Sequence, residues 1–149
     1  MISRPAKDSP ESKTPAIVDT GFLVAFARTE DRHHDWAKAV AVRLQLPLLT
    51  CEAVLAETSF MLQSSAYVLA MLRREVLTVA FDCGSNVGHL INLAVHYADR
   101  KPDLADLCLI RMSELFPRHT IVTVDGDFLV YRRNRREAIP VLTPHENLG

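Results

Sequence analysis

Four carboxylates in this chain stand at positions where an ordinary fold rarely puts a charge. Asp19 and Asp125 each end a short run of apolar or β-branched residues, which is typical of a strand. Glu57 and Asp106 each lie in a segment whose neighbours at helical spacing are largely apolar. A charge on a packed face is costly unless it is paired, and a divalent metal ion is a simple partner for several carboxylates. The pattern indicates a metal-dependent enzyme that acts on phosphates.

Helical spacing makes Glu57 and Asp106 the hardest of these acids to explain as ordinary surface residues. The residues three and four positions away from Glu57 are all apolar, so we expect its side chain to follow the packed face of a helix. Asp106 is followed on its own face by Leu109 and Ile110, and we expect it to face inward as well. A structural salt bridge is the alternative for Glu57, and a ligand-binding role is the explanation we favour.

The remaining acids also have ordinary explanations. Asp19 and Asp103 stand where helix N-caps are expected, since Asp is a favoured residue there. Asp125 and Asp127 flank a glycine, and this sequence is common in turns. Asp103 and Asp106 are three residues apart and share one face of a helical turn, where two like charges repel unless they share a cation. The sequence alone leaves these alternatives open.

As a set, the acids suit the hydrolysis of phosphodiesters with one or two metal ions. Hard cations take oxygen ligands, and Mg²⁺ is typically held by a few carboxylates while it keeps several waters. The ion activates a water and stabilises the charge that develops on the phosphate, without a side-chain nucleophile. The sequence contains no phosphate-binding loop of the GxxxxGKS/T kind, no GxSxG elbow and no HExxH motif.

The elements that must position these acids alternate between short apolar runs and longer amphipathic ones. The expected strands are 16–19, 48–50, 77–81, 120–124 and 141–142. The expected helices are 21–28, 33–44, 52–63, 65–74, 86–98 and 103–115. Strands separated by helices predict a mainly parallel sheet covered on both faces, hence an α/β fold. Ligands bind beyond the carboxyl ends of such strands, where Asp19 and Asp125 are expected.

Composition fits one soluble globular domain. The chain has 149 residues with a formal net charge of −1, so any binding of nucleic acid has to come from a local patch. The proline-rich residues 1–15 are expected to form a flexible tail before a domain that spans 16–149. The three cysteines show no paired spacing, and we see no signal peptide or membrane-spanning run, so we expect a cytoplasmic protein.

The basic segment 131–136, Tyr-Arg-Arg-Asn-Arg-Arg, is the best candidate for a patch that attracts a polyanion to an acidic site. Arg132 and Arg133 lie shortly after Asp125 in sequence and are the predicted RNA contacts. The alternative is a solvated surface, which is the commoner role of a run of charges. Its place beside the acids is what favours an RNA contact.

At these residues the chain resembles the PIN domains, and within them the VapC-type toxin ribonucleases. The resemblance runs from about residue 16 to residue 144 and depends on the order and spacing of several segments more than on any one of them. The matching segments are 18–21 (VDTG), 31–34 (DRHH), 55–58 (LAET), 103–106 (DLAD) and 123–128 (TVDGDF).

The resemblance implies a PIN-like three-layer α/β/α fold around a mainly parallel sheet of roughly five strands. It implies that the catalytic acids are Asp19, Glu57, Asp106 and Asp125, with Asp19, Asp106 and Asp125 as metal ligands. Auxiliary roles, as ligands through water or as orienting groups, fall on Asp103, Asp127, Thr20 and Thr123.

The same resemblance implies an Mg²⁺-dependent endoribonuclease, with Mn²⁺ as a substitute, that cleaves RNA such as transfer RNA. It also implies a homodimer that a cognate antitoxin inhibits, as in a type II toxin–antitoxin pair, and no membrane association. The alternatives are a PIN module that has lost catalysis and binds RNA or protein, and a housekeeping RNA-processing nuclease. A haloacid-dehalogenase-like phosphatase is a further alternative, but it needs an acid two residues after the strand-end Asp, where this chain has Gly21.

Overall fold

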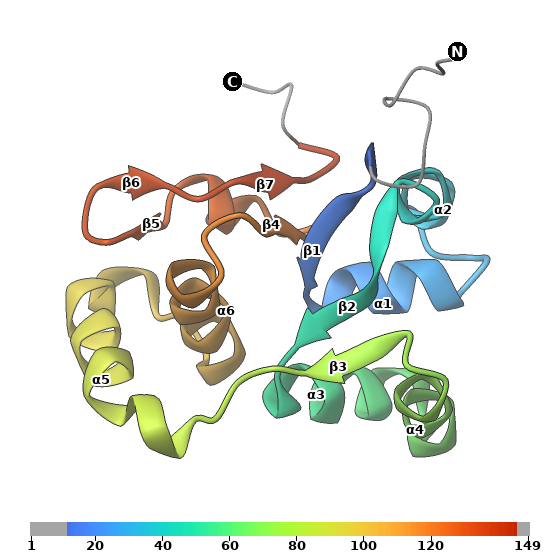
Figure 1. The fold of residues 1–149 in the computed structure, drawn as a ribbon, viewed down its shortest axis with the longest axis horizontal. Helices are drawn as coiled ribbons and strands as arrows, with labels where there is room; N and C mark the ends of the chain where they lie inside the picture. Colours follow the sequence, from blue (N-terminus) through green and yellow to red (C-terminus); the bar gives the residue numbers. More distant parts are fainter. Residues whose placement is uncertain (1–11, 146–149) are drawn as a thin grey trace, which may run out of the picture.

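A five-stranded parallel sheet with the strand order β3-β2-β1-β4-β7 lies at the centre of the protein (Figure 1). The computed structural model describes residues 12–145. The strands are β1 (Thr14–Val18), β2 (Leu44–Thr50), β3 (Leu77–Val79), β4 (Thr120–Val122) and β7 (Val141–Leu142). The predicted α/β fold with a parallel sheet is therefore confirmed.

The two central strands, β1 and β4, are buried on both faces. Ala16, Ile17 and Val18 in β1 and Ile121 and Val122 in β4 are all fully buried. Continuous apolar burial of this kind is what a parallel strand covered by helices requires. Val18 pairs with Val122 in the register of the two strands, so the residues that follow them emerge side by side.

Between residues 12 and 145, six α-helices flank the sheet, as Figure 1 shows for their arrangement. They are α1 (Thr20–Ala27), α2 (His34–Ala41), α3 (Glu52–Leu62), α4 (Ser65–Arg73), α5 (Val87–His96) and α6 (Leu104–Leu115). Helix α6 is apolar nearly all round, contacts β1, β4, α3 and α5, and buries most of its side chains, as such a helix must. In the part of the chain that the structure describes, no helix is long and apolar enough to cross a membrane.

Several element boundaries differ from those expected from the sequence. The helix expected over 33–44 ends at Ala41, and Leu44 instead begins β2, where it pairs with Thr14. The register between β1 and β2 is irregular there, which breaks the apolar periodicity that marks a strand. Strand β1 begins at Thr14, two residues inside the expected tail, and residues 1–11 lie outside the described part.

A small antiparallel hairpin was missed in the sequence. It consists of β5 (Arg132–Arg133) and β6 (Glu137–Ala138). Its turn places Asn134 and Arg135 at φ values of 49° and 75°, in the left-handed region. The strands are only two residues long, so no alternation distinguishes them from a run of charged residues on a surface.

Candidate active site

An acidic cleft of about 210 Å³ lies beyond the carboxyl ends of β1 and β4. Its carboxylates come from the end of β1, from the segment after β4 and from helices α3 and α6. They are Asp19, Glu57, Asp103, Asp106 and Asp125. The cleft therefore combines all four acids predicted to be catalytic, and it lies at the edge of the sheet where ligands of parallel α/β proteins bind.

Asp19 both caps helix α1 and lines the cleft. Its Oδ1 atom accepts a hydrogen bond of 2.9 Å from the Phe22 amide, which caps α1, and its Oδ2 atom accepts one from the Thr123 hydroxyl. The residue is 7% exposed. Burial raises the pKa of Asp19 to about 6, with smaller contributions from the charges of Asp125 and Glu57, while the two hydrogen bonds oppose the rise.

Thr123 joins the ends of the two central strands. Its buried hydroxyl donates to Asp19 and accepts a hydrogen bond of 2.8 Å from the Asp125 amide. Asp125 in turn accepts a hydrogen bond of 2.9 Å from the Asp127 amide through Oδ1, and so caps the 3₁₀ helix η5 (Gly126–Leu129). Thr123 does not line the cleft itself and instead fixes two residues that do.

The first turn of α6 supplies two adjacent acids. Asp103 is the N-cap and accepts a hydrogen bond of 2.8 Å from the Asp106 amide through Oδ1. Asp106 is half-buried. Burial raises the pKa of Asp106 to about 7, and the charges of Asp103, Asp125 and Asp19 raise it further. Near neutral pH the Asp106 carboxyl is therefore only partly ionised when no cation is bound.

Glu57 reaches the cleft, but the expectation that it follows a packed face is wrong. Its side chain is exposed, and so are Phe60 at 82% and Met61 at 46%. Apolar residues occur all round α3, so helical spacing does not distinguish its buried side from its open side. The Thr20 hydroxyl donates a hydrogen bond of 2.8 Å to Glu57 Oε1, which ties α3 to the start of α1.

The close approach of Gly21 to Val124 was not foreseen from the sequence. A Cβ atom at Gly21 would collide with Cγ2 of Val124 and would lie 3.7 Å from Oδ1 of Asp19. Both glycine and valine line the cleft. A residue without a side chain thus lets the segment after β4 close over the start of α1.

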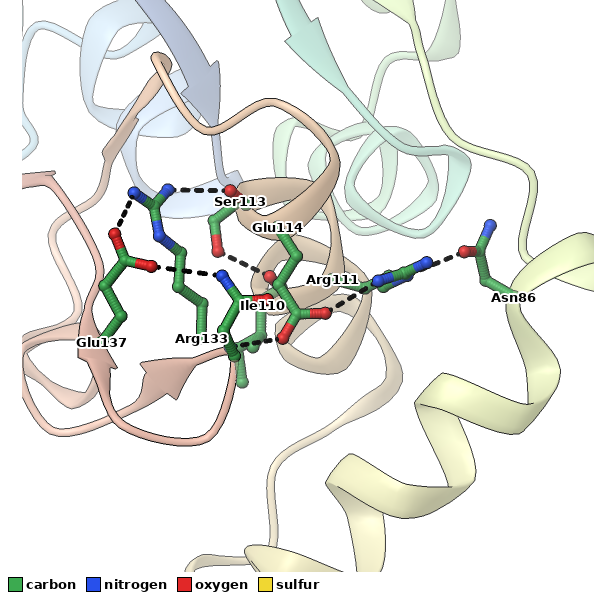
Figure 2. A network of polar contacts seen from close by, with 8 residues as sticks. Asn86, Ile110, Arg111, Ser113, Glu114, Arg133 and Glu137 are labelled. Atoms are coloured by element: carbon green, nitrogen blue, oxygen red, sulfur yellow. Dashed lines mark hydrogen bonds and ion pairs between the residues drawn. The ribbon is translucent and has the colours of Figure 1, made fainter.

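Asp127 and the two predicted RNA-binding arginines lie outside the cleft lining. Asp127 forms a salt bridge of 3.2 Å with Arg100. One guanidinium nitrogen of Arg132 donates to the backbone carbonyls of residues 129–131. Arg133 is 5% exposed and donates to the Ser113 carbonyl and to Glu137 (Figure 2). It also donates to the Pro117 carbonyl. This burial argues against the RNA contact expected at Arg133.

Within the described residues, no cationic side chain forms a salt bridge with an acid of the cleft lining. The salt bridges among the described residues are Arg100–Asp127, Arg111–Glu114 and Arg133–Glu137. The chemistry of the donor set, all carboxylate oxygen, fits a hard divalent cation. Within residues 12–145 no three His, Cys, Asp or Glu side chains form a ready-made metal centre.

Comparison of the sequence with models of known families and with curated proteins found no match. Comparison of the fold with solved structures found VapC20 of Mycobacterium tuberculosis, a toxin that cleaves the sarcin–ricin loop. The two share 19% sequence identity and superpose with a TM-score of 0.68, over 75% of this chain and 91% of that one. Because an identity this low is informative about architecture alone, the conclusion concerns the fold. This chain has the fold of a VapC-type PIN domain.

Proposed function

We propose that this protein is a divalent-metal-dependent endoribonuclease that hydrolyses RNA phosphodiester bonds. The observation that carries the proposal is the cleft: five carboxylates from distant parts of the chain line one cavity, and no Lys, Arg or His of residues 12–145 forms a salt bridge with them. Burial raises the pKa of Asp106, and the neighbouring anions Asp103 and Asp125, gathered without a counter-charge, raise it further. A fold built for stability alone gains nothing from this arrangement.

Asp19, Asp106 and Asp125 are the residues that would hold the cation, which is Mg²⁺ with Mn²⁺ as a substitute. When bound, the ion supplies an activated water and stabilises charge on the phosphate. Asp19 is oriented by Thr123 and by the Phe22 amide, so its oxygens are fixed before any ligand arrives. Asp103 caps α6 and holds the amide of Asp106.

Glu57 stands on the open side of the cleft and is the carboxylate best placed to accept a proton from an attacking water. It is exposed, and the Thr20 hydroxyl holds one of its oxygens. Glu57 therefore orients a water or a ribose hydroxyl instead of completing the buried anionic cluster.

Basic residues near the cleft support RNA as the substrate. The Arg28 guanidinium donates to the backbone carbonyl of Met61, a residue of the cleft lining. Arg100 and Lys101 are exposed and are separated from Asp103 by Pro102. These three residues take over the role expected of Arg133, and Arg132 stays a predicted contact through the part of its guanidinium that faces away from the backbone. Contacts of this kind bind RNA phosphates without reading the sequence.

We further propose that this protein is a cytoplasmic toxin of a type II toxin–antitoxin pair. The likeness in fold to VapC20, which cleaves the sarcin–ricin loop, supports a structured RNA as the substrate, and transfer RNA stays a prediction. We propose that it forms a homodimer and that a cognate antitoxin inhibits it. Exposed apolar side chains on α3 and α4, namely Phe60, Met61 and Leu69, support binding of a protein partner.

Cleavage of a structured RNA by the purified protein tests the enzymatic proposal. We expect cleavage with Mg²⁺ or Mn²⁺, none with a chelator, and none by Asp19→Asn or Asp106→Asn variants that keep the wild-type circular dichroism spectrum. Asp35→Asn, an exposed acid on α2 outside the cleft, is the matched control and should cleave normally. Full metal-dependent cleavage by both cleft variants would contradict the site assignment.

Binding without cleavage would favour a non-catalytic PIN module. In that case the wild-type protein retains RNA in a filter assay with either metal but leaves it intact. Growth arrest on expression in bacteria, relieved by the product of a neighbouring short reading frame, would distinguish a toxin from a housekeeping nuclease.

A further inference from the structure

The backbone carbonyl of Val124, a residue of the cleft lining, is bound by a side chain from the C-terminal part of the chain. Its oxygen lies 2.9 Å from Nε2 of His145. Because a carbonyl oxygen can only accept, Nε2 carries the hydrogen and donates it. Val124 lies beyond the last residue of β4, so the pairing of that strand does not supply this bond.

This hydrogen bond fixes the peptide unit that joins Val124 to Asp125. The amide of the same unit donates a hydrogen bond of 2.8 Å to the Thr123 hydroxyl. A peptide unit is planar, so it cannot turn while its carbonyl and its amide both keep their partners. Asp125, which lines the cleft, therefore leaves this peptide in one direction.

The ring of His145 also lies against the residue on the other side of Asp125. A Cβ atom at Gly126 would lie 3.9 Å from Cδ2 of His145. The imidazole thus meets the backbone both before and after this acid, through the Val124 carbonyl and through Gly126. These two contacts restrict the part of the chain from which the Asp125 side chain projects.

His33 supports the ring of His145. The two ring centroids are 5.8 Å apart and the ring planes meet at 81°, which is an edge-on contact. His33 is the N-cap of α2, and its amide donates a hydrogen bond of 2.8 Å to Oδ1 of Asp31. Both histidines are half-buried. The segment 31–34, one of those that carry the resemblance to PIN domains, is therefore connected to the cleft through His145.

We propose that His145 is a positioning residue that orients Asp125 for a divalent cation. This inference rests on the proposed function of the cleft. Oδ1 of Asp125 already accepts the Asp127 amide, so the direction of its carboxylate depends on how the backbone on either side is held. A metal ligand binds best when surrounding groups fix its orientation before the ion arrives, and His145 holds the peptide that precedes this ligand.

His145→Leu tests the inference through Mn²⁺ binding measured by titration calorimetry on the full chain. Leucine is also a branched side chain but cannot donate to the Val124 carbonyl. Groups that hold metal ligands typically contribute roughly 10–100-fold to affinity, and we expect a loss of about tenfold because His145 acts through the backbone. His145→Gln keeps an N–H donor and should bind Mn²⁺ within about threefold of the wild type.

His34→Leu is the matched control, because it removes the same kind of hydrogen bond elsewhere. Nδ1 of His34 donates over 2.8 Å to the carbonyl of Ala25 in α1, and neither residue lines the cleft. Both leucine variants should lower the free energy of unfolding without metal, since each leaves a carbonyl without its side-chain donor. His34→Leu should keep the Mn²⁺ dissociation constant within about twofold of the wild type, because Ala25 orients no proposed ligand.

Wild-type Mn²⁺ affinity in His145→Leu, or equal weakening in both leucine variants, would overturn the role of His145 alone. Binding as weak in His145→Gln as in His145→Leu would also overturn it, because the donated hydrogen bond would then not be what orients the site. Absence of Mn²⁺ binding by the wild-type protein would overturn the proposed function and this inference with it.

Discussion

The hydroxyl of Thr123 donates a hydrogen bond to the carboxylate of Asp19, a residue 104 positions earlier in the chain. The same oxygen accepts the amide of Asp125. A single buried side chain thereby sets the relative positions of the two strand-end acids. This bond depends on the pairing of β1 with β4, so the geometry of the cleft is coupled to the integrity of the central sheet.

Replacing Thr123 with valine should destabilise the protein and disturb the cleft. The substitution keeps the shape but removes the donor to Oδ2 of Asp19, while the Phe22 amide still binds Oδ1. A lost hydrogen bond to a charged group amounts to about 1.5–3 kcal/mol. Because that bond lowers the pKa of Asp19, its removal should raise the pKa beyond about 6. Urea unfolding at pH 8 measures the first effect, with Thr123→Ser as the control that keeps the hydroxyl. Equal losses of stability in the two variants would show that the hydroxyl is not responsible.

The metal-free protein should lose stability as the pH rises from about 4 to about 7. Folding raises the pKa of Asp19 to about 6 and of Asp106 to about 7, from the ordinary value of 3.8. Within this window the folded protein binds more protons than the unfolded chain, so the free energy of unfolding decreases as pH increases. Above the window both acids are charged in both states, and the contribution is constant.

Asp106→Asn should therefore stabilise the metal-free protein at pH 8 by about 1–2 kcal/mol and have little effect at pH 4. The full shift would correspond to more, but partial exposure of Asp106 screens its charge. Denaturant unfolding in the presence of a chelator at the two pH values gives the comparison. If Asp106→Asn destabilised the protein equally at both pH values, the charge of Asp106 would not be what destabilises the folded protein at pH 8.

The parts of the site that could be predicted from the sequence are those determined by residues close together in the chain. Asp19 and Asp125 could be placed because apolar runs mark parallel strands, and the ends of such strands meet at one edge of the sheet. Asp103 could be identified as a helix cap from its own neighbours. These predictions needed only the pattern of a few adjacent residues.

For Glu57 and Arg133, the pattern of neighbouring residues in the sequence does not predict whether the side chain is buried or exposed. Glu57 sits on a helix with apolar residues on every side, so its exposure depends on which side of α3 the rest of the fold covers. Arg133 is buried because the carbonyls of Ser113 and Pro117, at the end of α6, accept its guanidinium. Such acceptors lie far away in sequence, and no charge pattern within 131–136 indicates them.

Gly21→Ala should destabilise the protein by about 1–3 kcal/mol, because the added methyl group overpacks the contact with Val124. Valine is branched at Cβ and has few rotamers with which to yield. Gly88→Ala is the matched control: it lies near the start of α5, where a Cβ atom would meet nothing within 4 Å. That variant should gain up to about 1 kcal/mol from helix propensity. Thermal unfolding of both variants suffices, and similar effects of the two would refute the close packing at Gly21.

Arg133 is expected to act in stability and not in RNA binding. Its guanidinium connects the β5–β6 hairpin to the end of α6, and Glu114 accepts a hydrogen bond from Arg111 (Figure 2). Glu114 also accepts one from the Asn134 amide. Arg133→Gln leaves two carbonyls without a strong donor, and we expect a loss of about 2–4 kcal/mol in the free energy of unfolding.

The control for Arg133 is Arg136→Gln, an exposed arginine in the same hairpin that should unfold like the wild type. At a temperature where all the proteins are folded, the dependence of RNA affinity on salt should be the same for Arg133→Gln and the wild type, since a buried guanidinium displaces no counterions. Neutralising Lys101 beside the cleft should instead reduce that slope by about one. A reduced slope in Arg133→Gln with intact stability would return this residue to the RNA-binding surface.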